Sequence, residues 1–473
     1  MNCRPAGSTT GFTIDEILTA TGGELVRAGA ARTVRGISID TRTMKRGELY
    51  VAIIGKSLDG HRFVAQAVKN GAPAVVVSQA VLTRQRILAK HGAAVIRVSD
   101  TTRALGDIAA FHRRRFAPHV VGITGSNGKS TTKEMLAAIL GQRLRVLKPR
   151  SSFNNDIGVP LTVLELTSDT QAAVVEMEMN ILGGIRRLCE IAQPQTGIIT
   201  NIGDTHLEFL RDRDGVAQEK SELIEFINGN GTAVLNADDP RVAEIGRKFP
   251  TREQVWFGVE QKADIHASRV RDQGLDGVTF RLNGAADVHL SAVGAHNVTN
   301  ALAAAAGAHV AGLRLADIIA GLTAYRPLPL RLEVEQFAGL RVIADCYNAN
   351  PQSMSAALAI LAQTGKGRRI AVLGDMLELG EAATEAHRTV GRQAGEVADL
   401  VLVKGQYCRE VAAGARVAGL KAKAIFCAPD SRDIVEKLVD TAQAGDTILV
   451  KGSRANRMEV IVRELKAHYG EKD

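Results

Sequence analysis

Hydrophobic residues gather in short runs along the chain, and amphipathic stretches separate the runs. In the first stretch, which ends near residue 105, the runs lie at Gly36–Asp40, Leu49–Ile54, Ala74–Val77 and up to Val98. Runs of this length rich in Val, Ile and Ala are typical of buried strands. Phe63–Asn70 carries a helical pattern between two of them. Alternating strands and helices predict a sheet that is covered by helices.

The same pattern continues through two further stretches. Strands are predicted in the second at Val120–Thr124, Ala173–Glu176, Gly197–Asn201 and Ala233–Leu235, and in the third at Arg341–Ala344, Ile370–Leu373, Leu400–Val403, Ala424–Phe426 and Thr447–Val450. Pro327-Leu328-Pro329 separates the two stretches. The length of 473 residues also suits three domains at ~150 residues each. We therefore predict an α/β chain with a small α/β N-terminal domain (1–105), a central P-loop-type parallel sheet (106–327) and a C-terminal Rossmann-like domain (328–473).

Composition narrows the class of protein but not the ligand. With 45% hydrophobic and 23% charged residues the chain is not disordered, and its net charge of +8 suits an anionic ligand, either a nucleotide, a nucleic acid or a membrane surface. No apolar run approaches the ~20 residues that span a bilayer, and Met1 to Gly11 lacks a signal-peptide core. The five cysteines have no metal-site spacing, so we expect reduced thiols in a cytoplasmic protein: Cys3, Cys189, Cys346, Cys408 and Cys427. The basic cluster His112–Arg115 is interpreted as a solvated helix end.

The clearest chemical signal is a glycine-rich segment between a predicted strand and a predicted helix. It reads Gly122-Ile123-Thr124-Gly125-Ser126-Asn127-Gly128-Lys129-Ser130-Thr131. Glycines let backbone N–H groups surround phosphate oxygens, Lys129 would reach the β- and γ-phosphates, and the hydroxyl of Ser130 or Thr131 would bind Mg²⁺. The spacing departs from the usual phosphate loop, because Ile123 stands where the first glycine is expected. The segment predicts nucleoside triphosphate binding and leaves kinase, ATPase, GTPase and ligase open.

Polar side chains follow other predicted strands. Glu176 ends one strand, Asn201–His206 follows the next, and Lys220 and Glu222 come shortly afterwards. Ligand sites in α/β sheets lie at the carboxyl ends of strands. A carboxylate and an imidazole there predict a site for a divalent cation beside the phosphates.

These segments together resemble the ATP-dependent Mur ligases of peptidoglycan synthesis. The resemblance spans nearly the whole chain and rests on the loop Thr124–Thr131 and on further segments: Asp40–Arg42, Gly47–Ala52, Asp59–His61, Asn154–Leu161, Thr200–Glu208, Gly294–Ala301, Asp345–Pro351 and Leu373–Gly380. The last two are most similar to the family member that adds D-alanyl-D-alanine. The resemblance implies an ATP-dependent amide ligase that joins this dipeptide to UDP-N-acetylmuramoyl-tripeptide through an acyl phosphate.

The resemblance also implies roles for individual residues. Lys129, Lys220 and His206 would be catalytic, and Lys220 would be carbamylated by CO₂. ATP would contact Gly125, Ser126, Asn127, Gly128, Lys129, Ser130 and Thr131, with Asn297 and Asn300 near the adenine and Arg331 and Asp345 reaching it from the third domain. Two Mg²⁺ ions would be held by Ser130, Glu176, His206 and Lys220. The other substrates would contact Thr41, Arg42, Asn154, Asn155, Asn348 and Asn350.

The family would place the protein in cell-wall biogenesis, and so in cell shape and cell division. We expect a cytoplasmic monomer with small-molecule substrates and without nucleic-acid or membrane partners. Alternatives are a Mur ligase for another amino acid, a folylpolyglutamate-type ligase, and a nucleic-acid-dependent P-loop ATPase. No helicase or RNA-binding motif supports the last.

Three positions depart from the family pattern. Glu178 stands where a glycine is expected, Ala344 replaces the first acid of an Asp-Asp pair, and Leu330 replaces the glycine before Arg331. The phosphate and metal positions are intact, so we expect an active enzyme.

Overall fold

The computed structural model describes residues 11–55, 57–78, 88, 90–150, 153–249, 253–365 and 367–470. The backbone packs into two compact units. The first takes in the described residues up to Ile123 with Leu144–Met179 and Gly183–Gly197, and the second takes in Thr124–Arg143, Asn180–Leu182 and the described residues from Ile198 onward. None of the helices in this described part has the length and apolarity needed to cross a lipid bilayer.

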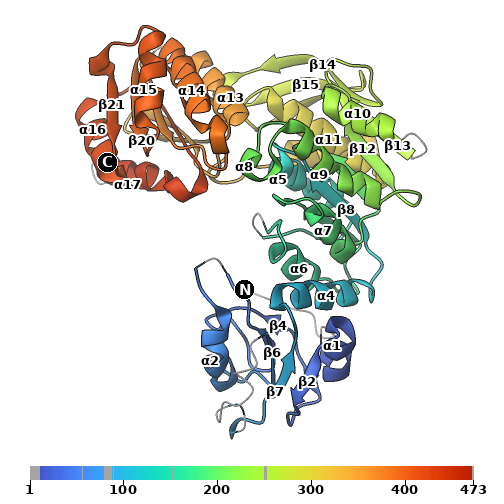
Figure 1. Cartoon of the computed structure of the whole chain (residues 1–473). Coiled ribbons are helices and arrows are strands. Elements are labelled where there is room, and N and C mark those ends of the chain that lie inside the picture. Colours follow the sequence, from blue (N-terminus) through green and yellow to red (C-terminus); the bar gives the residue numbers. More distant parts are fainter. Residues whose placement is uncertain are drawn as a thin grey trace. The chain divides into compact units, whose positions relative to one another are not determined.

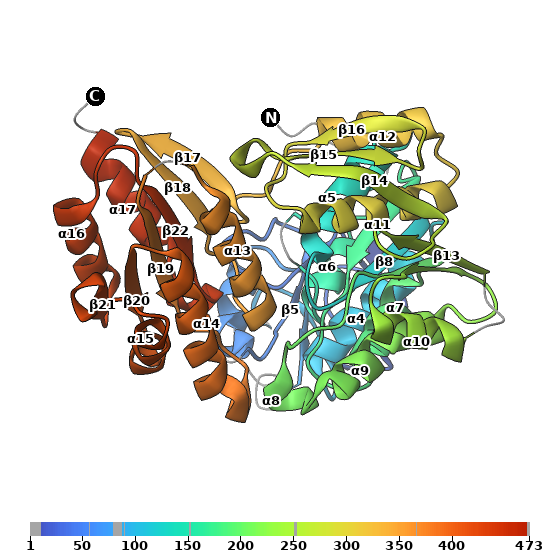
Figure 2. The same ribbon diagram turned by 90° about the horizontal axis from the view of Figure 1, so that it is seen from above.

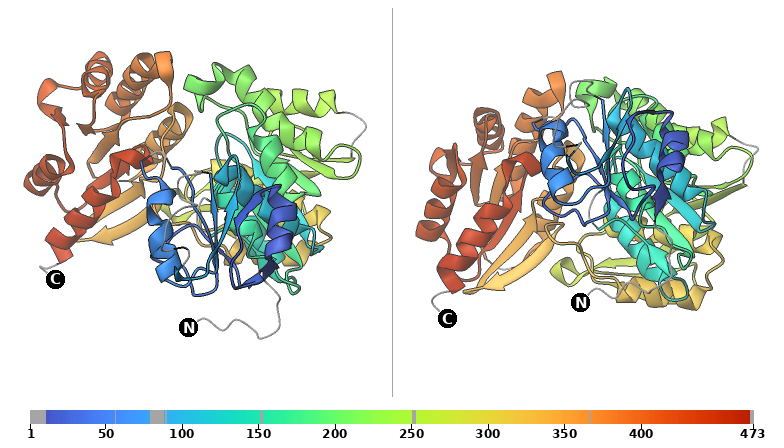
Figure 3. Two further views of the ribbon diagram at one scale, coloured as in Figure 1. Left: turned by 60° about the horizontal axis from the view of Figure 1, so that its bottom comes forward. Right: turned by 90° about the horizontal axis from the view of Figure 1, so that it is seen from below.

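The first unit holds a five-stranded sheet in the order β2–β7–β6–β5–β4. Its strands are β2 (Glu24–Arg27), β4 (Ile37–Ser38), β5 (Leu49–Val51), β6 (Ala74–Val77) and β7 (Ala94–Arg97), all parallel except β2 against β7. Helices α1 (Ile14–Thr21) and α4 (Thr101–Arg113) pack on one face and α2 (Val64–Lys69) on the other (Figures 1 and 3). Burial on both faces explains why β5, β6 and β7 read as continuous apolar runs. Two short strands, β1 (Phe12–Thr13) and β3 (Thr33–Val34), pair separately.

The strand that leads into the glycine-rich segment is β8 (His119–Thr124), which runs parallel to β10 (Ala172–Glu176) with Ile123 opposite Glu176. The nine-stranded sheet has the order β16–β15–β14–β13–β12–β11–β8–β10–β9. Three of its other strands are β9 (Val146–Leu147), β11 (Thr196–Ile199) and β12 (Thr232–Asn236). The helices of this region are α5 (Lys129–Leu140), α6 (Gly158–Val163), α7 (Gly184–Ala192), α8 (Leu207–Leu210), α9 (Arg213–Phe226), α10 (Pro240–Lys248), α11 (His296–Val310) and α12 (Leu315–Ala324), and α5 packs against both α11 and α12.

The sequence pattern missed the far edge of this sheet. β13 (Glu253–Gly258) and β14 (Ile265–Asp272) are parallel, whereas β14, β15 (Val278–Leu282) and β16 (Ala286–Leu290) form an antiparallel meander. In β15 the buried Val278, Phe280 and Leu282 alternate with half-exposed residues. A half-buried strand has this alternation rather than a continuous apolar run, and so a search for runs overlooks it.

The C-terminal segment forms a six-stranded sheet in the order β17–β18–β22–β19–β20–β21. Its strands are β17 (Glu333–Phe337), β18 (Leu340–Asp345), β19 (Arg369–Gly374), β20 (Leu400–Lys404), β21 (Ile425–Ala428) and β22 (Thr447–Lys451), and only β17 is antiparallel to its neighbour. On one face lie α13 (Pro351–Gln363), α14 (Ala383–Val397) and α15 (Cys408–Val417), and on the other α16 (Ser431–Thr441) and α17 (Glu459–Gly470) (Figure 2). The predicted α/β class is confirmed, while the boundaries at residues 105 and 327 stay a prediction.

The interpretation of His112–Arg115 as a solvated helix end is wrong for two of its residues. His112 is fully buried and Arg113 is 5% exposed. Arg113 donates to the backbone carbonyls of Ala192 and Phe116 at 2.9 and 2.7 Å. Backbone acceptors thus compensate the guanidinium for lost water, which composition alone does not reveal.

The cysteine prediction is also wrong in part. Cys408, at the start of α15, and Cys427 in β21 form a disulfide, with Cα atoms 5.9 Å apart. Cys189 and Cys346 are buried, and burial raises the pKa of Cys346 to about 12. Cys3 lies outside the described residues. Two cysteines without a diagnostic spacing meet here because β20 and β21 are neighbours and α15 packs on both.

The disulfide predicts a measurable thiol count. We expect the unfolded, unreduced protein to show two fewer reactive thiols than the reduced protein. The replacement of both Cys408 and Cys427 by serine should lower the free energy of unfolding by about 3 kcal/mol, since the sulfurs close a loop across 19 positions. Thiol titration with and without reductant, and denaturant melts, provide the readouts. Equal thiol counts would contradict the pairing.

Candidate active site

The loop after β8 depends on two glycines. Gly125 and Gly128 have φ angles of +141° and +83°, in the region that favours glycine. A side chain would also collide with neighbours: a Cβ on Gly125 would overlap Thr200 Oγ1, and one on Gly128 would overlap Asn300 Oδ1. The chain therefore turns tightly from β8 into α5, whose first residue is Lys129. The N-terminal end of α5 carries a partial positive charge suited to an anion.

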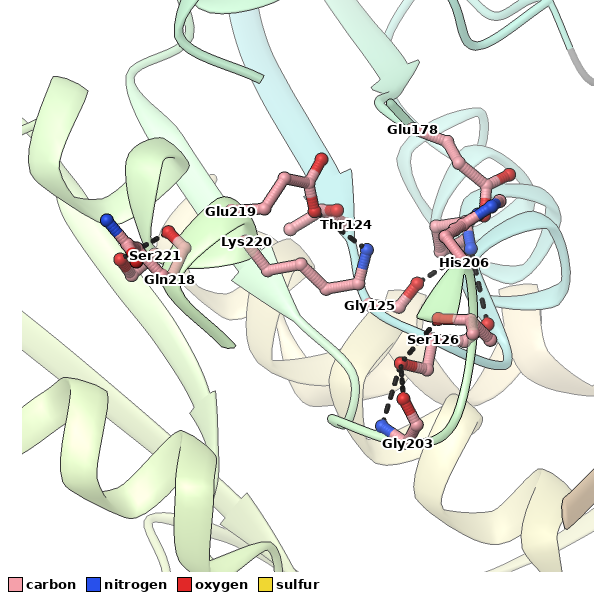
Figure 4. Close-up of polar contacts among 12 residues, drawn as sticks. Thr124, Gly125, Ser126, Glu178, Gly203, His206, Gln218, Glu219, Lys220 and Ser221 are labelled. Carbon is pink, nitrogen blue, oxygen red and sulfur yellow. Dashed lines mark hydrogen bonds and ion pairs between the residues drawn. The ribbon is translucent and has the colours of Figure 1, made fainter. Parts of the chain in front are cut away.

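Polar side chains from the segment after β11 hold this loop. Ser126 Oγ accepts from the Gly203 N–H at 2.7 Å and donates to the Gly203 carbonyl at 3.1 Å (Figure 4). The Asn127 N–H donates to Asn201 Oδ1 at 2.9 Å, and Thr200 Oγ1 donates to the Asn127 carbonyl at 2.6 Å. These hydrogen bonds fix the loop backbone before any ligand binds.

The side chains of Lys129 and Ser130 lie at the loop. Lys129 is 6% exposed, and its Nζ donates to the Gly125 and Ser126 carbonyls at 2.6 and 3.3 Å. Arg331 Nη2 donates to Ser130 Oγ at 2.9 Å, and its guanidinium stacks on the Tyr347 ring at 4.1 Å. Arg331 therefore contacts the phosphate loop through Ser130, and its contact with ATP stays a prediction. Two cations at one loop suit a polyanionic ligand.

Lys220 is not a surface lysine. It lies on α9 with a fully buried side chain, and its Nζ is 3.1 Å from Oε2 of the fully buried Glu219 (Figure 4). A buried lysine without a compensating anion would be costly, and Glu219 supplies that anion. The sequence motifs do not single out Glu219.

His206 pairs with a residue far along the chain. Its Nδ1 is 2.6 Å from Oε2 of Glu378, and the Glu208 N–H donates to the Glu378 carbonyl at 3.4 Å. His206 and Glu378 have φ angles of +55° and +63°, which are unfavourable for residues other than glycine. A carboxylate on Nδ1 orients an imidazole so that its Nε2 side is the one available to a metal ion.

In the first unit, Glu176 ends β10 and is 1% exposed. Asn154 Nδ2 donates to Glu176 Oε1 at 2.9 Å and to Glu178 Oε2 at 3.0 Å. The unexpected Glu178 is thus accommodated as a second acceptor for Asn154. Asn155 uses its Oδ1 to accept from the N–H groups of Ile157 and Gly158, which begins α6.

The residues predicted near the adenine are buried on α11. Asn300 Nδ2 donates to Asn297 Oδ1 at 2.9 Å, and Asn297 Nδ2 donates to the Val293 carbonyl at 2.8 Å. Asn300 Oδ1 lies against Gly128, so this pair also supports the phosphate loop.

Residues of the C-terminal segment that were assigned to ATP or to substrate have structural partners. Asp345 Oδ2 accepts from the buried Lys451 Nζ at 2.6 Å, and that lysine also donates to the Asn348 carbonyl at 3.0 Å. Asn350 caps α13, since its Oδ1 accepts from the Ser353 N–H at 2.8 Å. Lys451 therefore holds the turn from β18 towards α13 in place.

The two predicted substrate residues of the N-terminal sheet lie after β4. Arg42 is 86% exposed at its side chain and bonds to both carboxylate oxygens of Asp40, at 2.6 to 3.1 Å. These hydrogen bonds lower the pKa of Asp40 to about 2. Thr41 accepts through its carbonyl from Asn70 Nδ2 at 2.8 Å.

Comparison with known proteins accounts for all of these segments. The Mur ligase middle domain matches residues 123–308, the glutamate ligase domain of Mur ligases residues 330–454, and the Mur ligase catalytic domain residues 33–113. A UDP-N-acetylmuramoyl-tripeptide–D-alanyl-D-alanine ligase of Bacillus subtilis is 34% identical over 91% of this chain and 93% of its own. The chain belongs to the Mur ligase family.

Solved structures of Mur ligases agree with this assignment. MurF from Acinetobacter baumannii aligns with a TM-score of 0.87 and 32% identity over 97% of this chain and 99% of that chain. MurF from Thermotoga maritima, solved in complex with ADP, aligns with a TM-score of 0.80 and 27% identity over 93% of this chain and 99% of that chain. This Mur ligase therefore shares the fold of those enzymes along nearly its whole length.

Two departures of this Mur ligase from its family, Leu330 and Ala344, pack in one core of the C-terminal segment. Leu330 has a φ of +61° and Leu332 a φ of +51°, so the position before Arg331 has the backbone conformation that glycine adopts most easily. Leu330 packs against the core under α16 and α17, and Leu332 packs against the core under α13 and α14. Ala344 is fully buried in the same core as Leu330, where an acid would lack water.

Three partner residues received no role from the sequence, although one of them, Glu378, lies in the family-like segment Leu373–Gly380. Glu378, Gln352 and Lys451 contact predicted site residues that lie 172, 225 and 106 positions away. Within the described ranges, no cluster of three or more His, Cys, Asp or Glu could hold a metal ion. The predicted magnesium ligands include only two residues of these types, so this finding does not test them.

Proposed function

We propose that this Mur ligase uses ATP to join D-alanyl-D-alanine to UDP-N-acetylmuramoyl-tripeptide, the reaction in the names of its relatives. The carrying observation is the pre-formed loop Gly125–Ser130, with Lys129 at the start of α5, in a chain that matches such a ligase over 91% of its length. The three domains proposed at 1–105, 106–327 and 328–473 would serve the UDP-sugar, ATP and the incoming amine.

The chemistry follows from charge. A carboxylate oxygen of the tripeptide attacks the γ-phosphorus and ADP leaves, which gives an acyl phosphate. The amine of the dipeptide then attacks the acyl carbon, phosphate leaves, and the nitrogen loses a proton. Lys129, Arg331 and the N-terminus of α5 stabilise the negative charge that builds up on the transferring phosphoryl group. The loop fixes this arrangement beforehand, so little reorganisation accompanies the reaction.

The donor set also suits magnesium. The Glu176 carboxylate and the Ser130 hydroxyl are 1% and 2% exposed, and such oxygens are the ligands that Mg²⁺ prefers. We propose that two Mg²⁺ ions bind through Ser130, Glu176, His206 and a carbamylated Lys220, where they would offset the repulsion between carboxylate and triphosphate. We further propose a cytoplasmic monomer that acts in cell-wall synthesis and so in cell division.

A substrate panel tests the proposed function. We expect purified protein with ATP and Mg²⁺ to release ADP only when UDP-N-acetylmuramoyl-tripeptide and D-alanyl-D-alanine are both present. Matched reactions replace the dipeptide by glutamate or a diamino acid, or both organic substrates by DNA or RNA. Turnover with another amine would move the chain to a different ligation step. ADP release that depends on nucleic acid would overturn the ligase proposal.

A further inference from the structure

The side chain of Asn127 joins the phosphate loop to the start of α13. Its backbone is held by Thr200 and Asn201, as described above, but its amide side chain faces another part of the chain. Asn127 Oδ1 accepts from Asn350 Nδ2 at 2.8 Å, and Asn127 Nδ2 donates to Gln352 Oε1 at 2.7 Å. Both polar groups of this side chain are therefore used by the first turn of α13.

The orientation of the three amides follows from the helix cap. Asn350 Oδ1 accepts the Ser353 N–H, so its Nδ2 is the group that faces Asn127. Asn127 must then present Oδ1 to Asn350, which leaves Nδ2 for Gln352. Because a backbone N–H anchors the series, the donor and acceptor roles are not interchangeable.

Gln352 also touches the segment that braces the loop. A Cβ on Gly203 would lie 2.5 Å from Gln352 Oε1, so this oxygen lies directly against the Gly203 backbone. Gly203 bonds to Ser126 of the phosphate loop through both its N–H and its carbonyl. One side chain of α13 thus contacts two strand-end segments that shape the phosphate site.

We propose that Gln352 is a positioning residue for nucleotide binding, a role that rests on the proposed function of the loop. Gln352 fixes the Asn127 amide and so keeps the loop in its phosphate-binding conformation. That conformation then depends on the position of α13, which follows β18. Nucleotide binding and the docking of α13 would therefore strengthen each other, since a coupling between two sites is reciprocal.

Direct titration with ADP tests the role without relying on turnover. Gln352→Ala should weaken ADP binding about fivefold to tenfold, the effect of one lost hydrogen bond. The KM for ATP should rise in parallel, whereas the melting temperature and the KM for the UDP-linked substrate should change little. Gln363→Ala is the matched control, because Gln363 is an exposed glutamine at the other end of the same helix.

A double-mutant cycle separates positioning from a general structural role. If Gln352 acts through Asn127, then Gln352→Ala should add less than about twofold to the ADP dissociation constant of Asn127→Ala. Additive effects, or a Gln352→Ala protein that binds ADP like the Gln363→Ala control, would overturn the proposal. If the wild-type chain binds ADP but ligates no substrate, the proposed function fails while the role of Gln352 still stands or falls on the titration.

Discussion

Replacement of Lys129 by alanine is expected to lower kcat by about 100- to 1,000-fold while the protein stays folded. The Lys129 ammonium bonds to the Gly125 and Ser126 carbonyls, so it lies at the loop where the phosphates are expected. Its loss removes a fixed positive charge from the transferring phosphoryl group. The measurement is ADP release under saturating substrates, together with a thermal melt.

The exposed Lys262 serves as the control for this substitution. Lys262→Ala removes the same charge from an exposed position beyond β13 and should leave kcat within about twofold of the wild type, as surface changes usually have small effects. Loss of ADP release in both variants would point to a general effect of charge. A Lys129→Ala protein with near-normal kcat would contradict the assignment of the loop.

The second large effect is expected at Lys220. Lys220→Ala should lower kcat by more than about 100-fold, since it removes a proposed metal ligand. In the uncarbamylated form, whose ammonium lies 3.1 Å from the carboxylate of the fully buried Glu219, the substitution should also cost about 3–5 kcal/mol of folding stability, because it breaks that buried pair. Activity and stability therefore fall together in the single variant.

A double variant distinguishes the two causes. Glu219→Leu combined with Lys220→Met replaces the buried pair by apolar side chains of similar size, which is often neutral or stabilising. We expect the double variant to regain most of the lost stability and none of the lost activity. Recovery of turnover together with stability would show that Lys220 acts only in folding, and its metal role would be withdrawn.

The sequence predicted the elements whose formation depends on neighbouring residues, namely the buried strands and the glycine-rich loop. Continuous apolar runs identified the buried parallel strands, and glycine spacing identified the loop at Gly125 and Gly128. The meander β14–β16 was not predicted, because its strands are half-buried and their buried and exposed residues alternate. The cysteines gave no warning of the Cys408–Cys427 pair, since only the packing of α15 on β21 brings them together.

In the candidate site, too, some residues could be predicted from the sequence and others could not. The family resemblance supplied expected roles for residues at the phosphates and metal ions, whereas it supplied none for their hydrogen-bond partners. Glu378 supports His206, Gln352 supports Asn127 and Lys451 supports Asp345, each across more than a hundred positions. Such partners are selected by the fold, because any polar side chain of suitable length at the right place could serve. Family motifs consequently report the reacting groups better than the groups that hold them.

Leu330 and Leu332, on either side of Arg331, tie the backbone of that residue to the C-terminal sheet. Leu330 and Leu332 are anchored in the cores on opposite faces of that sheet, so a twist of the backbone between them would pull one side chain out of its core. Both leucines are partly buried, so exposure of either one costs about 1 kcal/mol, which opposes such a twist. A displacement of the sheet would therefore carry the Arg331 backbone with it and disturb the hydrogen bond from its guanidinium to Ser130.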